Sequence, residues 1–454
     1  MANINPEIFR EYDIRGISNK DLNPDIFELI GKSYGTYMRE RGKRIVSLGR
    51  DCRSTSPEYS EALSKGMTST GINVANIGMV STPMLYFSLF NLDVDGGIMV
   101  TASHNPGEYN GVKLCNGSEA LYGEQIQEIR NIAESRNFIT GNGSVEHTSI
   151  RDKYLGYLRE NLDISPGLKV AIDYGNGMVG IVGPEIIREF KCDSRELYPE
   201  PDGTFPNHHP DPTVEENLKD LIYEVKNGDY RVGLAFDGDG DRVGVIDENG
   251  NIIWGDLLVL IFARDILKHI PGAKVIGDVK CSSRLFKGVE EAGGQPIMWT
   301  TGHSLMKKKM KIEKAALGGE MSGHIFFADR FYGYDDALYA GLRLFEILSK
   351  TGKSVSELIK DVPVTVSTPE IRVDCPDSLK FKVVEKIKEV LRDENKIIDI
   401  DGVRIEYDDG WGLIRASNTQ PALVLRFEAK TEDRLQEIRK LIESKLDEVK
   451  AAIG

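Results

Sequence analysis

A repeated phrase constrains the fold of this chain more than any other sequence feature. Residues 166–173 read PGLKVAID and residues 271–278 read PGAKVIGD, and GKRIVSLGRD (42–51) is a looser third copy. In each copy a turn leads into a short β-branched strand that ends at an aspartate. Helical stretches such as residues 256–270 separate the strands. Strands that alternate with helices are typical of αβ units on a largely parallel sheet.

The repeat predicts an α/β fold with three related αβα domains in tandem, whose sheets are mixed and largely parallel. The alternative is that a common turn-to-strand phrase recurs by chance, but the similar spacing favours a repeat. The end of the chain differs, because residues 377–394 and 432–452 read as amphipathic helices on either side of strand-like runs. This pattern predicts a C-terminal α+β domain. The predicted domains are residues 1–147, 148–251, 252–364 and 365–454, arranged around a central cleft, with linkers read from composition at 140–147 and 361–370.

Composition excludes several classes of function. The chain has 57 Lys and Arg against 71 Asp and Glu, a formal net charge of −14, whereas general binding to nucleic acid or to anionic membranes needs a basic surface. The sequence shows neither a signal peptide nor an apolar run of about 18 residues, so we expect a cytoplasmic protein. The five cysteines are odd in number and form no CxxC pair, so we expect reduced thiols rather than disulfides or a zinc site.

Each predicted domain presents one polar loop after a strand, where ligands bind on sheets of this kind. The loops are TASHNPGEYNGVK (101–113), DGDGDR (237–242), GGEMSGH (318–324) and RASNTQP (415–421). The second loop predicts a metal site, because glycines between Asp237, Asp239 and Asp241 let three carboxylates turn toward one point. A hard cation such as magnesium or calcium would relieve their repulsion.

The DGDGD loop has two alternative interpretations, and the sequence argues against both. An EF-hand calcium loop is excluded, because Arg242 stands at its sixth position, where glycine is needed, and the flanks read as strands. An acidic solvated turn is disfavoured by the apolar runs on both sides. Three carboxylates leave an octahedral ion with open positions, which suits a phosphate oxygen as the next ligand.

Ser103 is the candidate to carry that phosphate. A phosphoserine adds a charge of roughly −1.5 to −2 and acceptor oxygens that can reach a metal, and Lys113 follows closely enough to manage charge or protons. Taken alone, a serine in a loop more often makes ordinary turn hydrogen bonds. The combination with DGDGD favours a nucleophile.

The last two loops could bind the rest of a phosphorylated sugar. In RASNTQP, an arginine fork and turn donors suit a remote phosphate. In GGEMSGH, Glu320 and Ser322 suit sugar hydroxyls. The alternative readings are a capped surface turn and an exposed glycine-rich connection.

Taken together, TASHNP with Lys113, DGDGDR, GEMSGH and RASNT resemble the α-D-phosphohexomutase superfamily over essentially the whole chain. FREYDIRG (9–16), FPNHHPDP (205–212) and TGHSLMKKKM (301–310) are similar to its phosphomannomutase/phosphoglucomutase group. The resemblance implies an isomerase that interconverts hexose 6-phosphate and hexose 1-phosphate, of mannose and/or glucose. It also implies a phosphoserine, one Mg²⁺ per chain, and hexose 1,6-bisphosphate as intermediate and activator. The alternatives are a phosphoglucosamine mutase, a phosphatase and a non-catalytic sugar-phosphate binding protein.

The resemblance also implies residue roles. The catalytic residues would be Ser103, Lys113, Arg242 and His303, and the metal ligands Ser103 (through its phosphate), Asp237, Asp239 and Asp241. The substrate-binding residues would be Tyr12, Arg15, Lys280, His303, Glu320, Ser322, His324, Arg415, Ser417, Asn418 and Thr419. We expect sugar phosphates as partners and neither nucleic acid nor membrane, with the oligomeric state left open. Because mannose and glucose differ only at C2, a site that holds O3 and O4 predicts the use of both.

Overall fold

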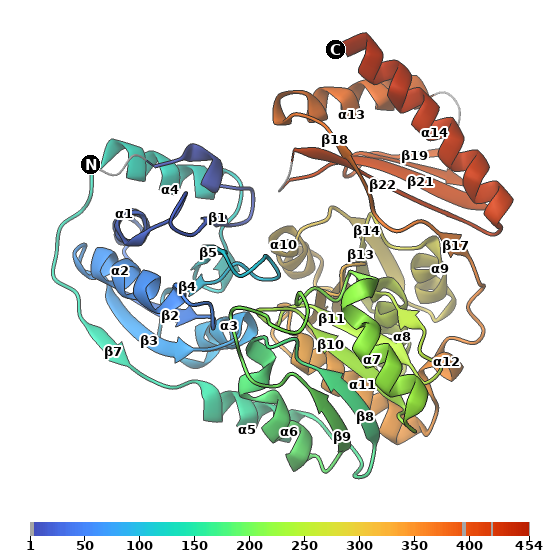
Figure 1. Ribbon diagram of the computed structural model, residues 1–454, viewed down its shortest axis with the longest axis horizontal. Coiled ribbons are helices and arrows are strands. Elements are labelled where there is room, and N and C mark those ends of the chain that lie inside the picture. Colours follow the sequence, from blue (N-terminus) through green and yellow to red (C-terminus); the bar gives the residue numbers. More distant parts are fainter. Residues whose placement is uncertain (1–3, 393–395, 419–420, 454) are drawn as a thin grey trace.

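The computed structural model describes residues 4–392, 396–418 and 421–453. These residues form four units, each a sheet with its helices (Figure 1). The first unit has strands β1 (Ile14–Ile17), β2 (Ile45–Arg50), β3 (Asn73–Met79), β4 (Gly96–Val100), β5 (Tyr109–Asn116), β6 (Glu119–Ala120) and β7 (Val145–His147), with helices α1 (Pro24–Glu40), α2 (Ser56–Thr68), α3 (Thr82–Asn91) and α4 (Glu124–Ser135).

The second and third units are built on the same plan. The second has β8 (Lys169–Asp173), β9 (Asp193–Leu197), β10 (Val232–Phe236), β11 (Val243–Asp247) and β12 (Ile252–Ile253), with α5 (Arg151–Asn161), α6 (Gly183–Glu189) and α7 (Lys219–Asn227). The third has β13 (Lys274–Asp278), β14 (Gln295–Trp299), β15 (Leu317–Gly319) and β16 (Ile325–Phe327), with α8 (Gly255–Leu267), α9 (Ser283–Glu291), α10 (His303–Glu313), α11 (Ala337–Thr351) and α12 (Val355–Leu358).

The repeated phrase occupies the same strand in all three units. The strand orders β3-β2-β4-β5, β9-β8-β10-β11 and β14-β13-β15-β16 correspond one to one, and β2, β8 and β13 carry the three copies of the phrase. Each of these strands has parallel neighbours on both sides. The fourth strand of each set is antiparallel. The predicted tandem αβα fold with mixed sheets is therefore confirmed.

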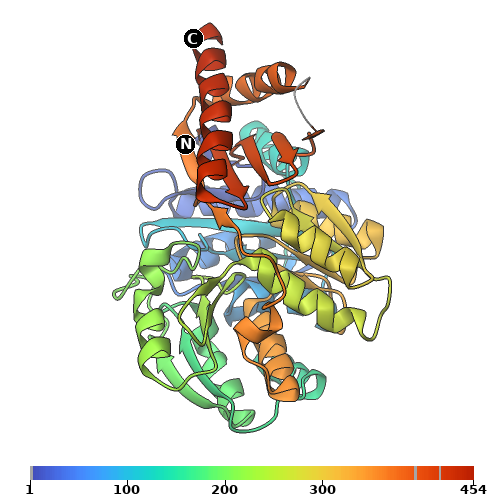
Figure 2. The same ribbon diagram turned by 90° about the vertical axis from the view of Figure 1, so that its right-hand side faces the viewer.

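The fourth unit is the predicted α+β module. Its strands are β17 (Val366–Ser367), β18 (Ile371–Asp374), β19 (Lys396–Ile398), β20 (Val403–Tyr407), β21 (Gly410–Ala416) and β22 (Ala422–Ala429), with helices α13 (Asp377–Leu391) and α14 (Glu432–Ile453). The strand pairs recorded for this sheet are antiparallel. Figure 2 shows this unit, in red and orange, standing above the other three.

The apolar cores divide the molecule unequally. One cluster of buried side chains runs through the second and third units and takes in Met84 and Phe87 from α3 of the first. The first unit also has a core of its own, between its sheet and α1, α2 and α4. The fourth unit has a separate core between its sheet and α13 and α14. The first three units are therefore joined by continuous packing.

The fourth unit meets the third through a small apolar cluster and through polar contacts. Val279 packs with Trp411 and Leu413. The guanidinium of Arg404 lies 3.8 Å from the ring of Trp411 and donates to the carbonyl oxygens of Val279 and Cys281 at 2.7 and 2.6 Å. A cation stacked on indole with its donors satisfied is a stable anchor between the two units.

Both predicted linkers contain a short strand that composition did not indicate. Residues 140–147 include β7, which pairs in parallel with β3, and residues 361–370 include β17, which pairs with β22. Composition missed both because the strands are short and largely exposed, and their pairing supplies backbone hydrogen bonds rather than buried side chains. The predicted domain limits stay predictions. Among the described helices, none combines the length and apolarity needed to cross a bilayer.

Candidate active site

The four predicted loops hold equivalent positions in the fold. Each joins a strand to its antiparallel neighbour, namely β4 to β5, β10 to β11, β15 to β16 and β21 to β22. In the first three units the loop follows the carboxyl end of a strand from the parallel part of the sheet, the usual place for a ligand. Three of the loops can be located in Figure 1 from the labels of the flanking strands β4 and β5, β10 and β11, and β21 and β22.

Ser103 lies in the loop after β4 and is 3% exposed. Its Oγ is 3.0 Å from Nδ1 of His104 and 3.1 Å from Oδ2 of Asp237, which belongs to the second unit. The φ of Ser103 is +52°, a left-handed conformation that costs a residue other than glycine roughly 1–2 kcal/mol. A Cβ at Gly238 would lie 2.5 Å from the carbonyl oxygen of Ser103, so glycine is required where the two loops touch.

The DGDGD loop buries all three aspartates completely. Oδ1 of Asp237 accepts hydrogen bonds from the backbone N–H groups of Gly240, Asp241 and Arg242 at 3.0, 3.0 and 3.1 Å, which closes the turn. Gly240 has a φ of +82°, where glycine is favoured. Burial and the charges of Asp241 and Asp239 raise the pKa of Asp237 well above its usual value. Carboxylates held this closely favour a bound cation.

The donor set fits a hard divalent cation. One oxygen from each aspartate lies within 4.8 Å of the others. Oδ1 of Asp239 and Oδ1 of Asp241 are buried and accept no hydrogen bond from the described residues, so both can serve as metal ligands. Lys113, on β5, compensates part of the charge, since its Nζ is 2.8 Å from Asp239 Oδ2 and 2.5 Å from Asp241 Oδ2. Although burial opposes the ammonium, these carboxylates raise the pKa of Lys113.

A chain of polar side chains extends from the metal loop into the third unit. Arg242 Nε donates to His324 Nε2 at 2.9 Å, and His324 Nδ1 lies 3.0 Å from Oδ2 of the buried Asp335. Lys307 Nζ binds the other oxygen of Asp335 at 2.9 Å. The ring of His303 stacks on that of His324, with 5.8 Å between centroids. Burial lowers the pKa of His303 well below its usual value, so its imidazole is neutral and can accept a proton.

Glu320 and Ser322 lie side by side after β15. Glu320 is 3% exposed, and its Oε1 accepts the backbone N–H of Gly302 at 2.8 Å while Oε2 accepts the Ser322 hydroxyl at 3.2 Å. Burial raises the pKa of Glu320. Asp278, at the end of β13, supports the same region by accepting the Thr301 hydroxyl at 3.0 Å. An adjacent carboxylate and hydroxyl can bind neighbouring hydroxyls of a sugar ring.

The hydroxyl of Tyr12 joins three units. It donates to the carbonyl oxygen of Thr301 at 3.0 Å and accepts a hydrogen bond from Nδ2 of Asn418 at 2.7 Å. Asn418 lies in the loop after β21. On that strand, Arg415 is 5% exposed, and its Nε donates to Asp401 at 2.9 Å. The loop of the fourth unit thus reaches the first unit at Tyr12.

The remaining predicted binding residues lie around these groups. Arg15, on β1, donates to the side-chain oxygen of Asn105 in the Ser103 loop at 2.8 Å. Lys280 follows β13, is 7% exposed and pairs with Glu370 at 3.3 Å. Ser417 is buried in the loop after β21. Thr419 lies outside the described residues.

The sequence did not reveal two residues that contact the predicted site. Thr82, at the start of α3, donates its hydroxyl to Asp239 Oδ2 at 2.6 Å and its backbone N–H to the Asp239 carbonyl oxygen at 2.9 Å. Ser81, Thr82 and Pro83 carry an N-cap signal, which marks a helix start but not a contact with the metal loop. Asp335 precedes the helix cap Asp336 and carried no signal of its own.

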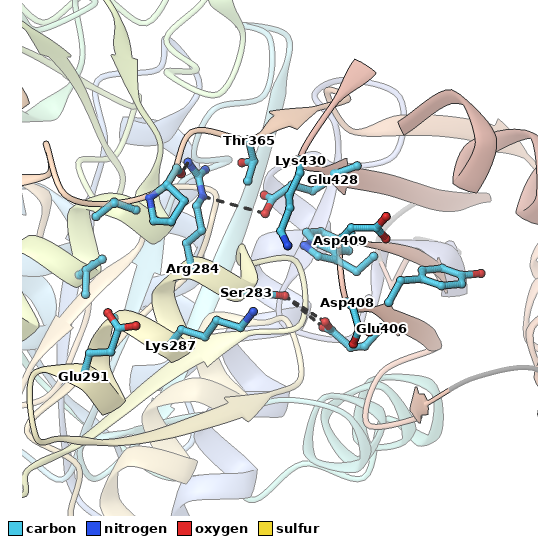
Figure 3. Close-up of a pocket in the computed structure, with 18 of the residues that line it drawn as sticks. Ser283, Arg284, Lys287, Glu291, Thr365, Glu406, Asp408, Asp409, Glu428 and Lys430 are labelled. Atoms are coloured by element: carbon cyan, nitrogen blue, oxygen red, sulfur yellow. Dashed lines mark hydrogen bonds and ion pairs between the residues drawn. The ribbon is translucent and has the colours of Figure 1, made fainter. Parts of the chain in front are cut away.

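A separate cavity of about 140 Å³ lies between the third and fourth units (Figure 3). Ser283 and Arg284 on α9 face Glu406 and Glu428 of the fourth unit across it. The residues that line it include none of the predicted site residues. This cavity is therefore separate from the predicted site at the four loops.

Family models, known proteins and a solved structure all indicate one protein family for this chain. Family models match the chain in order: "Phosphoglucomutase/phosphomannomutase, alpha/beta/alpha domain I" at residues 6–140, domain II at 152–250, domain III at 254–366 and the C-terminal domain at 370–445. A Pseudomonas aeruginosa protein named phosphomannomutase/phosphoglucomutase is 44% identical over 447 residues, which are 98% of this chain and 96% of that protein. A phosphoglucomutase of Neisseria meningitidis serogroup A is 46% identical over 444 residues, 97% of this chain and 96% of its own.

A solved structure is also closely similar. The crystal structure of a phosphoglucomutase/phosphomannomutase family protein from Burkholderia thailandensis has a TM-score of 0.94 and 41% identity, and the match covers 99% of this chain and 98% of that one. The resemblance to the α-D-phosphohexomutase superfamily is thus confirmed. The chain belongs to the phosphoglucomutase/phosphomannomutase family, whose members are phosphotransferase isomerases that use a metal ion and interconvert hexose 1-phosphates and hexose 6-phosphates.

Proposed function

We propose that this chain interconverts the 1- and 6-phosphates of both mannose and glucose, and that Ser103 carries the phosphate between the two positions. The observation that supports this most directly is the approach of Ser103 Oγ to Asp237, 3.1 Å across the boundary between two units. A cation and a phosphate bound at this place would account for a hydroxyl buried beside three carboxylates.

The reaction consists of two phosphoryl transfers. In the first, the free hydroxyl oxygen of a hexose monophosphate attacks the phosphorus on Ser103, the bond from phosphorus to Oγ breaks, and hexose 1,6-bisphosphate forms. The proton of the attacking hydroxyl passes to a base of the site, and the site returns one proton to Oγ as it leaves, so no proton is gained or lost overall. In the second transfer the other phosphate of the bisphosphate returns to Oγ by the same steps in reverse. The phosphoserine is restored and the product monophosphate is released.

The residues of the site support the geometry of these transfers. Mg²⁺ held by the three aspartates and a phosphate oxygen would neutralise charge on the group in transfer. Lys113 keeps the carboxylates of Asp239 and Asp241 together, and Arg242 extends from the same loop to bind the phosphate that moves. His303 is neutral because it is buried, so it can take the proton of the attacking hydroxyl.

The binding groups suit a sugar that reacts first from one end and then from the other. We assign Glu320 and Ser322 to O3 and O4 of the ring, and we assign Arg415, with Ser417, Asn418 and Thr419, to the phosphate that is not reacting. Tyr12, Arg15, Lys280 and His324 complete the site. None of these assignments includes a contact with the hydroxyl at C2, where mannose and glucose differ. Because each unit contributes one loop to the proposed site, we retain the predicted domain limits near residues 147, 251 and 364.

The test compares glucose 1-phosphate with mannose 1-phosphate as substrates, with Mg²⁺ and hexose 1,6-bisphosphate present. We expect both to be converted at similar kcat/KM, and mass spectrometry to find a phosphate on Ser103 after incubation with the bisphosphate. Ser103→Ala should abolish both, whereas Ser322→Ala should raise KM and leave the phosphoserine intact. A fully active Ser103→Ala variant would refute the role of Ser103. Faster turnover of glucosamine 6-phosphate than of either hexose would make the chain a phosphoglucosamine mutase.

A further inference from the structure

Arg53 makes an unusual set of contacts outside the residues assigned above. It lies in the loop between β2 and α2, and its side chain has no exposure to solvent. Nε donates to Asp51 at 3.1 Å. The other donors reach backbone carbonyl oxygens of the Ser103 loop and of the first residue of β5. Nη2 donates to those of Ser103 at 2.9 Å and Asn105 at 2.6 Å, and Nη1 to those of Pro106 at 2.5 Å and Tyr109 at 3.1 Å.

These five hydrogen bonds use every N–H group of the guanidinium. No donor is left for a phosphate, so Arg53 does not touch the reacting atoms. Three carbonyl oxygens of the Ser103 loop and one at the start of β5 instead bind a single buried cation, which fixes the path of the loop. Ser103 has the left-handed φ of +52° within this path, a conformation that persists only where its surroundings impose it. Arg53 supplies that constraint at the carbonyl group of Ser103 itself.

The second unit closes over the other side of Arg53. The guanidinium lies 5.2 Å from the ring of Phe205, the first residue of the FPNHHPDP segment, for which the mechanism above has no role. A Cβ at Gly203 would lie 2.3 Å from Cα of Arg53, and a Cβ at Gly107 would lie 2.8 Å from the carbonyl oxygen of Gly203. The Ser103 loop, Arg53 and residues 203–205 therefore form one close-packed junction. This junction lies between the unit with the nucleophile and the unit with the aspartates.

We propose that Arg53 is a positioning residue for phosphoryl transfer, which sets the place of Ser103 Oγ relative to Asp237 by holding the backbone of the nucleophile loop. The inference rests on the proposed role of Ser103. Because Arg53 acts on the nucleophile and not on the sugar, its loss lowers the rate of transfer and leaves sugar binding unchanged. Lysine keeps the charge but has three donors for five acceptors, so it replaces arginine only in part.

The test measures kcat and KM separately for Arg53→Lys and Arg53→Ala. Since a misplacement of about 1 Å can cost roughly a hundredfold in rate, we expect kcat to fall about a hundredfold in Arg53→Ala and less in Arg53→Lys, with KM within about twofold of wild type. Single-turnover transfer of phosphate from hexose 1,6-bisphosphate to Ser103 should slow by the same factor. Guanidinium at low millimolar concentration should restore part of the rate of Arg53→Ala, and ethylammonium should restore less.

Arg343→Ala is the matched control. Arg343 is also buried and paired, with Asp329 at 2.9 Å, but it lies on α11 and holds no part of the Ser103 loop. Its loss should lower the unfolding temperature with kcat per folded molecule unchanged. If Arg53→Ala does not fold, the test is the comparison of kcat and KM between Arg53→Lys and wild type. An unchanged kcat in Arg53→Lys with only a lower unfolding temperature, or a raised KM with normal kcat, would overturn the inference. An active Ser103→Ala would instead overturn the proposed function, so the two failures can be told apart.

Discussion

Replacing Lys113 by methionine tests whether the metal site depends on a balance of buried charge. The side chain of Lys113 is 5% exposed, and its ammonium bonds to two carboxylates that are fully buried. Methionine keeps most of the volume of the side chain but removes the charge, so three carboxylates face one another without a counter-ion. Breaking a buried ion pair by removing one partner costs about 3–5 kcal/mol. We therefore expect Lys113→Met to unfold at a clearly lower temperature than wild type in the presence of a chelator.

A divalent cation should reverse much of this loss. A ligand at a hundred times its dissociation constant adds about 2.7 kcal/mol to the stability of the folded state. Removing the positive charge of Lys113 from the triad also favours binding of the cation, so at equal Mg²⁺ concentration the gain should be larger in the variant than in wild type. The assay is the apparent unfolding temperature in chelator and across a series of Mg²⁺ concentrations.

Lys307→Met is the matched control for this prediction. Lys307 is also largely buried and pairs with a buried carboxylate, but that carboxylate is Asp335, which is not a member of the triad. Its loss should lower the unfolding temperature to an extent that Mg²⁺ does not reverse. The reasoning fails if Lys113→Met is as stable as wild type in chelator. It also fails if Mg²⁺ stabilises Lys113→Met no more than wild type.

Three further changes have definite expected results. Tyr12→Phe removes the hydroxyl that joins the first unit to Asn418 of the fourth. The loss of about 1 kcal/mol should raise KM about fivefold with little change in kcat, in steady-state kinetics. Arg415→Lys gives up a planar fork for a point charge, and a rise of about tenfold in the KM for glucose 1-phosphate is expected, whereas equal KM values would contradict a phosphate role. Burial raises the pKa of Asp336 from 3.8 to about 7, so the carboxyl ionises at lower pH in the unfolded state. The contribution of Asp336 to stability is therefore fully present below pH 3.8 and is lost as the pH rises to about 7. Asp336→Asn should remove this decline, as measured by urea midpoints at pH 5 and pH 7.5, and an unchanged slope would exclude Asp336 as its source.

Features with a local signature could be predicted from the sequence. The phrase that ends in Asp173 and Asp278 identified equivalent strands, because a turn followed by β-branched residues specifies a strand without reference to the rest of the chain. The DGDGD loop was recognisable in the same way, since all three carboxylates and the glycines that orient them lie within five consecutive residues, 237–241. Pairing between short exposed strands left no such trace, which is why β7 and β17 were read as linkers.

The motifs predicted that Ser103 and the DGDGD loop meet, but contacts made by residues outside the motifs could not be predicted. Thr82 and Asp239 are separated by 157 positions, and Arg53 and Ser103 by 50. Nothing in the local sequence of Thr82 or Arg53 distinguishes a side chain that holds the site from one that caps a helix or pairs on the surface. Their roles depend on how the first unit docks on the second, and only the three-dimensional packing defines that.

The division of the apolar cores matches the demands of the reaction. Phosphoryl transfer needs the nucleophile and the metal ligands in one fixed geometry, and the units that carry the proposed nucleophile and the proposed metal ligands share a continuous core. The loop assigned to the non-reacting phosphate belongs to the fourth unit, which has its own core and meets the third through Arg404 and a small apolar cluster. A rearrangement that admits the sugar or turns the bisphosphate around would expose the least apolar surface there. The same fold can therefore keep Ser103 rigidly beside the aspartates and still leave the fourth unit free to move.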